Sequence, residues 1–188
     1  MIVTRETGRS RSPLIRRALG TGTAVPVQPS RPTPAELAAL TDLLAEARPR
    51  IETITIGHGR DTVFRDAAWA FARSWESAGG NVLAVVDWPE EAASWLRPAR
   101  RFAAGDPDAW VVTGAALGWA QMSRRLRHST GWDPRRTYGL ACVGDVRVVE
   151  LAGPGTLDGM CGASADGGVW RIGRGLITYY PRQDESFR

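Results

Sequence analysis

Ten residues that could bind a ligand or exchange protons occur in three short stretches of this 188-residue chain, each directly after a strand-like run. The strand-like runs are residues 51–56, which are rich in Ile and Thr, and the apolar residues 82–86 and 109–112. The ten residues that follow them are Gly57, His58, Gly59, Arg60, Asp61, Asp87, Trp88, Thr113, Gly114 and Ala115. These stretches form the candidate functional site.

His58 changes its charge near neutral pH, so it could act as a general acid or base. Asp61 or Asp87 would then be its acidic neighbour, which makes these three the candidate catalytic residues. Each also has a purely structural explanation. A histidine in a loop is commonly a surface residue, Asp61 can cap the next helix, and Asp87 ends a strand.

The remaining chemistry of these stretches is that of ligand binding. Backbone N–H groups at helix starts favour a carboxylate or another anion. Arg60 could clamp a carboxylate or could simply be solvated, and Trp88 could supply an apolar or stacking wall. The candidate ligand-binding residues are therefore Gly57, His58, Gly59, Arg60, Trp88, Thr113, Gly114 and Ala115.

The elements that must position these residues alternate along residues 51–142. The expected strands are residues 51–56, 81–86, 109–113 and 137–142, and the expected helices are residues 62–78, 89–104 and 115–129. This alternation is typical of βαβ units around a parallel sheet. Ligands bind such sheets beyond the carboxyl ends of the strands, near the switch in strand order. We therefore expect the three stretches to meet at one edge, around His58.

Local signals refine these elements. Thr33-Pro34-Ala35-Glu36 predicts a capped helix start, with threonine as the cap and glutamate closing a capping box. Residues 82–86 are apolar at every position, which predicts a central strand covered on both faces. Pro98 predicts either a kink or a fresh helix start within residues 89–104.

The predicted fold class is α/β, with a three-layer, Rossmann- or flavodoxin-like, mostly parallel sheet and a C-terminal β-hairpin. Residues 169–172 and 176–180 form that hairpin about Gly173-Arg174-Gly175. The predicted organisation is an N-terminal arm rich in Arg, Gly and Pro over residues 1–32, a single α/β domain over residues 33–181, and a C-terminal tail over residues 182–188.

Charge and hydropathy bound the partners. All 24 basic residues are arginines, the net charge is +4, and much of it lies in the arm. No aromatic residues alternate with those arginines, so a solvated tail is expected and a nucleic-acid partner is not. No apolar run reaches the ~18 residues that span a bilayer, and the N-terminus lacks the apolar segment of a signal peptide. We expect a cytoplasmic protein without a membrane span.

No metal site or cofactor is expected. The two cysteines, Cys142 and Cys161, and the two histidines are too widely separated to form a metal site by spacing. Gly57-x-Gly59 follows a strand, but position 62 is threonine where a dinucleotide-binding fingerprint has its third glycine.

Several segments between residues 51 and 162 resemble one protein family. They are Gly59-Arg60-Asp61, Gly79-Gly80, residues 106–112 with Gly114, Leu151-Ala152-Gly153-Pro154 and Leu157-Asp158-Gly159-Met160. Their order and spacing are similar to those in the carboxyl-side lobe of the type I periplasmic binding proteins, the branched-chain amino-acid receptor group. The family has two lobes and usually a tyrosine where this chain has His58. The resemblance implies one flavodoxin-like lobe, and it does not imply transport.

Three functions stay open at this point. The first is a non-catalytic binding or regulatory module that recognises a small polar or anionic ligand, with a homodimer as an arrangement that could complete the site. The second is a small biosynthetic enzyme that uses His58 and a nearby carboxylate, Asp61 or Asp87. The third is a structural or protein-interaction subunit that uses its arginine-rich arm for contact.

Overall fold

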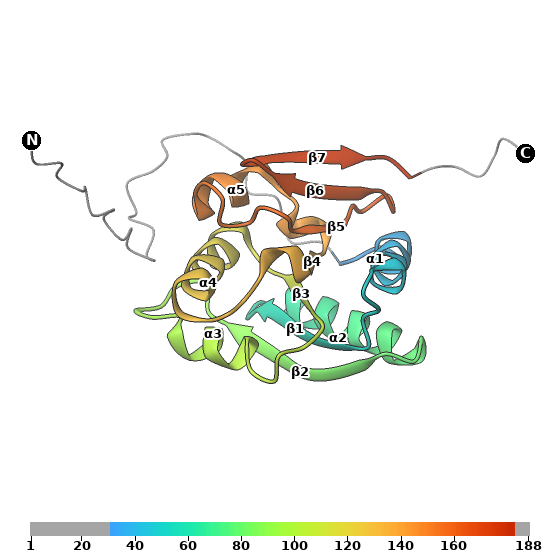
Figure 1. Cartoon of the computed structure of the whole chain (residues 1–188), viewed down its shortest axis with the longest axis horizontal. Coiled ribbons are helices and arrows are strands. Elements are labelled where there is room, and N and C mark those ends of the chain that lie inside the picture. The colour runs from blue at the N-terminus through green and yellow to red at the C-terminus, as the bar shows by residue number, and fades with distance from the viewer. Residues whose placement is uncertain (1–30, 183–188) are drawn as a thin grey trace, which may run out of the picture.

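The computed structural model describes residues 31–182 of the chain (Figure 1). Helices and strands alternate as far as residue 163, and two further strands follow. The helices are α1 (Pro34–Glu46), α2 (Thr62–Ser77), α3 (Leu96–Phe102), α4 (Ala116–Ser129) and α5 (Val146–Ala152). The strands are β1 (Thr53–Gly59), β2 (Asn81–Trp88), β3 (Ala109–Thr113), β4 (Thr137–Gly139), β5 (Cys161–Ala163), β6 (Val169–Gly173) and β7 (Leu176–Tyr180). The predicted arm and tail lie almost wholly outside these residues.

All seven strands form one sheet in the order β2-β1-β3-β4-β5-β6-β7. Neighbouring strands from β2 to β5 are parallel, whereas the pairs β5–β6 and β6–β7 are antiparallel. The order 2-1-3-4-5 is that of flavodoxin-like sheets, in which the chain switches direction between β1 and β3. The predicted α/β class, the mostly parallel sheet and the C-terminal hairpin are confirmed.

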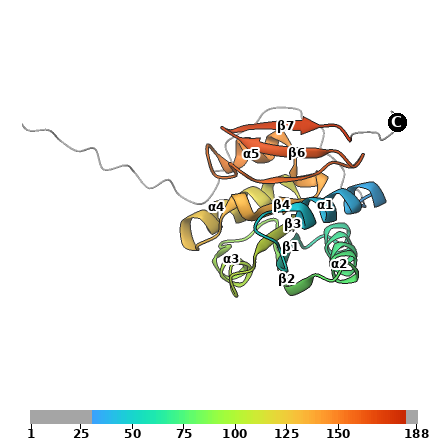
Figure 2. The same cartoon turned by 45° about the vertical axis from the view of Figure 1, so that its right-hand side comes forward.

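Helices cover both faces of the sheet, which makes three layers (Figure 2). On one face α1 and α2 bury Leu40, Leu44 and Phe71 against strand residues such as Ile54 and Val111. On the other face α3, α4 and α5 bury a second cluster, and its large members are Trp88, Phe102, Trp110, Trp119, Met122, Trp132 and Trp170. Within residues 31–182, none of the helices has the length and apolarity needed to cross a membrane.

The predicted capping box at the start of α1 is present. The Glu36 backbone N–H donates to Thr33 Oγ1 over 3.0 Å, and the Thr33 N–H donates to Glu36 Oε2 over 3.3 Å. The other carboxylate oxygen of Glu36 accepts a 2.6 Å hydrogen bond from the N–H of Ala141, in the 3-10 helix Ala141–Val143 after β4. One side chain therefore both starts α1 and ties it to the sheet.

Three sequence expectations need correction. Strand β2 lies at the edge of the sheet, not at its centre, and its residue Leu83 is 44% exposed. A strand that is apolar on both faces can be covered by helices and still have only one neighbouring strand. No helix starts at Pro89, and α3 begins at Leu96, so that Pro98 falls in its first turn where proline is tolerated. Strand β4 ends at Gly139, and residues 141–143 turn into the 3-10 helix.

The hairpin turn between β6 and β7 follows its sequence signal. Arg174 and Gly175 are its two central residues, and both have positive φ, of 54° and 73°. Two-residue hairpin turns favour this geometry because its twist matches that of the strands.

The rings of Trp88 and Phe102 pack directly against the backbone of β1. Trp88 is fully buried, with its ring centroid 6.3 Å from that of Phe102 and 5.6 Å from that of Trp119. A Cβ on Gly57 would lie 2.5 Å from Trp88 Cζ3 and 2.6 Å from Phe102 Cε2. Only glycine at position 57 leaves room for both rings.

Gly57→Ala should therefore destabilise the protein by about 1–3 kcal/mol, the usual effect of overpacking a dense core. Urea unfolding followed by tryptophan fluorescence measures the change. Gly131→Ala is the matched control, because a Cβ on Gly131 would meet nothing within 4 Å. Equal stability of Gly57→Ala and the natural protein would contradict this account of the packing.

Candidate functional site

The carboxyl ends of β1, β2 and β3 meet at one edge of the sheet. In the strand register, His58 lies opposite Asp87 of β2 on one side and Thr113 of β3 on the other. We call this edge the rim and define it as residues 57–61, 87–90 and 113–118. The structure brings the three candidate stretches together, while the roles of their residues stay predictions.

His58 is inside the protein rather than on a loop surface. It is the sixth residue of β1 and is 6% exposed. Its Nδ1 lies 2.7 Å from the carbonyl oxygen of Gly59, and because a carbonyl only accepts, Nδ1 carries the hydrogen in this contact. The neighbouring Thr113 is also buried, and its hydroxyl lies 3.3 Å from Cys142 Sγ. Both predicted site residues are shielded from solvent.

Asp87 and Arg60 neutralise each other. Arg60 Nε donates to Asp87 Oδ2 over 2.7 Å, and Arg101 approaches the other carboxylate oxygen of Asp87 to 3.9 Å. The hydrogen bond from Arg60 holds the pKa of Asp87 below its ordinary value. Arg60 uses only its Nε in this ion pair, and its side chain is exposed, so its Nη groups stay available to a ligand carboxylate, as the sequence suggested.

Two expectations about the rim are wrong in their detail. Trp88 is fully buried in the cluster beneath the rim, so it cannot form an exposed wall for a ligand. Because β2 side chains alternate between the faces of the sheet, the residue after Asp87 must point into the opposite layer.

Asp61 stands at the N-cap position of α2, but its side chain accepts no hydrogen bond from the helix. The Asp61 carboxylate is exposed at the start of α2.

Glu90 is the rim residue that sequence reasoning missed. It lies in the loop after β2, and its carboxylate rests against the backbone of β1 and α4. A Cβ on Gly59 would lie 2.5 Å from Glu90 Oε1, and a Cβ on Gly118 would lie 2.1 Å from Glu90 Oε2. Oε1 is buried and has no hydrogen-bond partner among the described residues.

The pKa of Glu90 is raised from 4.5 to about 7. Burial is the largest cause, and the negative charge of Asp61 adds to it. The backbone N–H groups of Gly118 and Ala115, at the start of α4, act in the opposite direction but do not compensate. Near neutral pH this carboxyl group is therefore divided between its neutral and ionised forms.

The sequence offered one signal for Glu90, its position two residues after Trp88 and three after Asp87. We interpreted it as part of the first turn of a helix, where acidic residues are common. The Glu90 carboxylate fits against the backbone because Gly59 and Gly118 have no side chains. These two glycines are 59 residues apart in the chain. Only the folded structure brings these glycines together.

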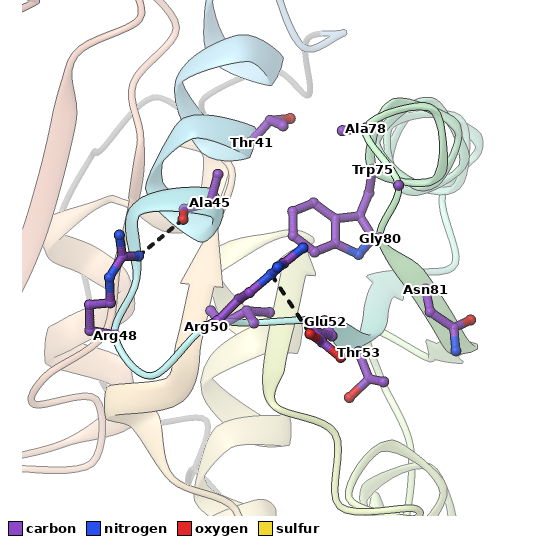
Figure 3. Close-up of a pocket in the computed structure, with 12 residues that line it drawn as sticks. Thr41, Ala45, Arg48, Arg50, Glu52, Thr53, Trp75, Ala78, Gly80 and Asn81 are labelled. Carbon is purple, nitrogen blue, oxygen red and sulfur yellow. Dashed lines mark hydrogen bonds and ion pairs between the residues drawn. The ribbon is translucent and has the colours of Figure 1, made fainter.

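A hollow lies at the opposite edge of the sheet, between the ends of α1 and α2 (Figure 3). Its volume is about 810 Å³, and Arg48, Arg50 and Trp75 line it. Arg48 Nη1 donates to the last carbonyl groups of α1, at 2.8 Å from Ala47 O and 3.0 Å from Glu46 O. Arg50 lies 3.7 Å from Glu52. In this hollow Arg50 is paired with Glu52, and Arg48 is hydrogen-bonded to backbone carbonyl oxygens.

No protein-family model and no curated protein matches this sequence, but solved structures share its fold. A substrate-binding periplasmic protein from Ralstonia solanacearum aligns at a TM-score of 0.60 and 18% identity, over 72% of this chain and 37% of its own. An extracellular ligand-binding receptor from Rhodopseudomonas palustris aligns at 0.60 and 18%, over 71% and 36%. The branched-chain amino acid transporter substrate binding protein LivJ from Streptococcus pneumoniae, in complex with isoleucine, aligns at 0.56 and 13%, over 68% and 34%.

These alignments decide the fold. The chain has the fold of one lobe of a type I periplasmic binding protein. It spans little more than a third of the length of these proteins, 37% for the Ralstonia protein and 34% for LivJ. The resemblance seen in residues 51–162 is thus confirmed for the fold.

Within residues 31–182, the side chains that could bind a metal ion are dispersed, and both cysteines are at least partly buried. Among residues 31–182, no three His, Cys, Asp or Glu side chains are grouped closely enough to hold a metal ion. Cys142 and Cys161 are free thiols, and burial raises the pKa of both. A thiol with a raised pKa is mostly protonated near neutral pH and is a poor nucleophile.

Glu90 should make the stability of the lobe depend on pH. Its folded-state pKa, about 7, lies above the ordinary value of 4.5, so the folded lobe holds the proton more tightly than the unfolded chain. The stability from this proton is fully present below pH 4.5 and is lost as the pH rises to about 7. Glu90→Gln should be more stable than the natural protein at pH 8, on the order of 1 kcal/mol because partial exposure weakens the effect.

Urea unfolding of both proteins at pH 5.5 and pH 8 measures this difference. Glu91→Gln, which removes an exposed carboxylate from the next position, is the control and should match the natural protein at both pH values. A loss of stability in Glu90→Gln at pH 8 would show that the ionised carboxylate is well accommodated.

Proposed function

We propose that this chain is a non-catalytic binding module that takes a small polar ligand at the rim, with a positively charged group of the ligand against Glu90. The observation that carries the proposal is the half-buried Glu90 side chain, whose Oε1 has no hydrogen-bond partner among the described residues. A carboxylate in that position is stabilised by a cation or by hydrogen-bond donors, and a ligand amino group supplies both.

The polarity of the rim favours an amino group over an anion. The start of α4, where the sequence suggested anion binding, already has the Glu90 carboxylate near its N–H groups. Asp61 adds a second negative charge, and the cations of this edge, Arg60 and Arg101, face Asp87. An incoming anion would meet two carboxylates, which repel it.

The arrangement supports binding more than catalysis. His58 is buried, and the ring nitrogen with a recorded contact faces the Gly59 carbonyl oxygen. No hydrogen bond connects His58 with Asp61 or Asp87, all three of which the structure describes, and Asp87 is paired with Arg60. A general base needs hydrogen-bond reach to its substrate, and a buried ring offers little.

The solved structures of similar fold agree with a binding role. One of them is described as a ligand-binding receptor, and another holds isoleucine, an amino acid with the ammonium group that the rim would favour. Because the chain spans only about a third of those proteins, a second lobe or a second copy of this chain would complete an enclosed site. We propose a homodimer for that role, and the cellular compartment stays a prediction.

Binding should depend on the amino group and on Glu90. Isothermal titration calorimetry at pH 8 with L-isoleucine, L-leucine and 2-methylbutylamine should detect binding, whereas 3-methylpentanoate, which keeps the carboxylate of isoleucine and lacks the amino group, should not bind. Glu90→Gln should weaken binding about ten- to a hundredfold, since a hydrogen bond to a charged group contributes about 1.5–3 kcal/mol.

Glu91→Gln is the matched control and should bind as the natural protein does. If 3-methylpentanoate bound better than the amines, or if Glu90→Gln bound them unchanged, the proposed role of the rim would be wrong.

A further inference from the structure

We propose that strand β7 is an interface for a second copy of this chain, with the two β7 strands antiparallel and paired about Thr178. The contact joins the two sheets into one. Four strands separate β7 from β1 in the sheet order, so this is a different contact from the dimer proposed at the rim, and it leaves both rims accessible. The inference therefore does not rest on the proposed function.

The outer side of β7 has backbone groups without a strand to pair with. β7 is the last strand of the sheet, and among the described residues it pairs only with β6 (Figure 1). In an antiparallel strand, the N–H and C=O groups of successive residues point to alternate sides. Leu176 closes the two-residue turn and bonds to β6, as does every second residue after it. The groups of Ile177 and Tyr179 therefore point outward.

The side chains of β7 form an exposed apolar patch. Leu176, Tyr179 and Tyr180 are 70%, 55% and 50% exposed, and they are three of the seven exposed large hydrophobic residues in the described part of the chain. Residues 176–180 carry no charge, whereas β2, the other edge strand, contains Asp87. Natural sheets commonly protect an edge strand with charged residues. An uncharged edge rich in aromatic and aliphatic residues favours pairing with another strand.

Contacts on one face hold β7 in position for this pairing. The Tyr179 hydroxyl donates to the carbonyl oxygen of Gly144 over 2.6 Å, and Ile177 packs against the buried cluster that includes residues of α5. Because side chains alternate along a strand, Thr178 points to the opposite face, where it is exposed. The strand is thus already ordered, and less conformational entropy is lost when a second strand binds.

The sequence of β7 is complementary to itself. In an antiparallel pair centred on Thr178, this residue faces its own counterpart. Leu176 then faces the partner's Tyr180, and Ile177 faces the partner's Tyr179. Aromatic–aliphatic and threonine–threonine pairs of this kind stabilise neighbouring strands. The outward backbone groups also meet, which gives about four hydrogen bonds across the twofold axis. Since the contact uses the same surface on both copies, the assembly closes as a dimer.

Arginines beyond the ends of β7 oppose the contact weakly. Arg174 lies in the turn before the strand and Arg182 follows its end, and the pairing brings each near the other arginine of the second copy. Both residues are exposed, so salt screens their repulsion. The dimer should therefore tighten as the salt concentration rises, whereas an interface held together by ion pairs would weaken.

The test is analytical ultracentrifugation of the full chain without ligand, over a wide range of protein concentration. The mass should rise from that of the 20.4 kDa monomer toward twice that value. Thr178→Arg and Thr178→Asp each place like charges directly opposite one another and should weaken the dimer about tenfold. An equimolar mixture of the two variants should restore it, because opposite charges then face each other. Circular dichroism checks that both variants, changed at an exposed position, are folded.

Two further measurements locate the interface. Leu83→Asp changes an exposed residue of β2, the other edge strand, and should leave the dimer unchanged. Hydrogen–deuterium exchange followed by NMR should show slower exchange of the Ile177 and Tyr179 amides as the protein concentration rises. The Thr178 amide, which bonds to β6, is the internal reference and should exchange slowly throughout.

Restoration of the dimer in the mixture, with slowed exchange at the two outward amides, is the result expected. A chain that stays monomeric at all concentrations would overturn the inference. If those amides were nevertheless protected in the monomer, residues 1–30 or 183–188 of the same chain would cover β7 instead. A mixture that stays dissociated, or a dimer that only Leu83→Asp disrupts, would equally rule out pairing about Thr178. None of these results depends on ligand binding, so the proposed function is tested separately.

Discussion

The position of the rim depends on one constraint, the switch in strand order between β1 and β3. These strands are neighbours and parallel, yet α2 follows β1 onto one face of the sheet and α4 follows β3 onto the other. Both helices therefore begin at the same edge, with the N–H groups of their first turns directed toward it. The edge favours negative charge, and the chain itself places Asp61 at the start of α2 and Glu90 at the start of α4. The proposed ligand site thus already holds carboxylates of the protein itself, and these would favour a positively charged ligand group.

The layer beneath the rim explains why Glu90 is costly to ionise. Trp88, Phe102 and Trp119 form a dense aromatic floor that contacts the glycine backbone of β1. The indole N–H groups of Trp88 and Trp119 are buried and have no hydrogen-bond partner among the described residues. Such a floor offers little solvation to a carboxylate that lies above it, and burial disfavours the charged form.

The sequence predicted most of the fold because several independent local signals agreed. The capping box at Thr33, the glycine-containing turn at Arg174 and the alternation of strands and helices each had a physical cause that tertiary packing did not override. It failed where the answer depended on distant partners. An apolar run could not reveal that β2 lies at the sheet edge, nor could Trp88 reveal which layer its ring enters. Glu90 was missed because its environment consists of backbone at Gly59 and Gly118, and glycines at those positions carry no sequence signature of a site.

Asp87 and Glu90 show most clearly why the rim is a candidate site rather than a structural edge. Asp87 lies near the end of β2 and Glu90 three residues later in the following loop, yet they have opposite environments: Arg60 lowers the pKa of Asp87, whereas burial and Asp61 raise that of Glu90. A structural carboxylate is normally paired, as Asp87 is, because an unpaired buried charge lowers stability. Among residues 31–182, no ion pair is seen for Glu90, so its ionisation opposes folding at neutral pH. Groups whose environments separate their pKa values in this way are concentrated at functional sites, and a cationic ligand is the partner that would remove the imbalance.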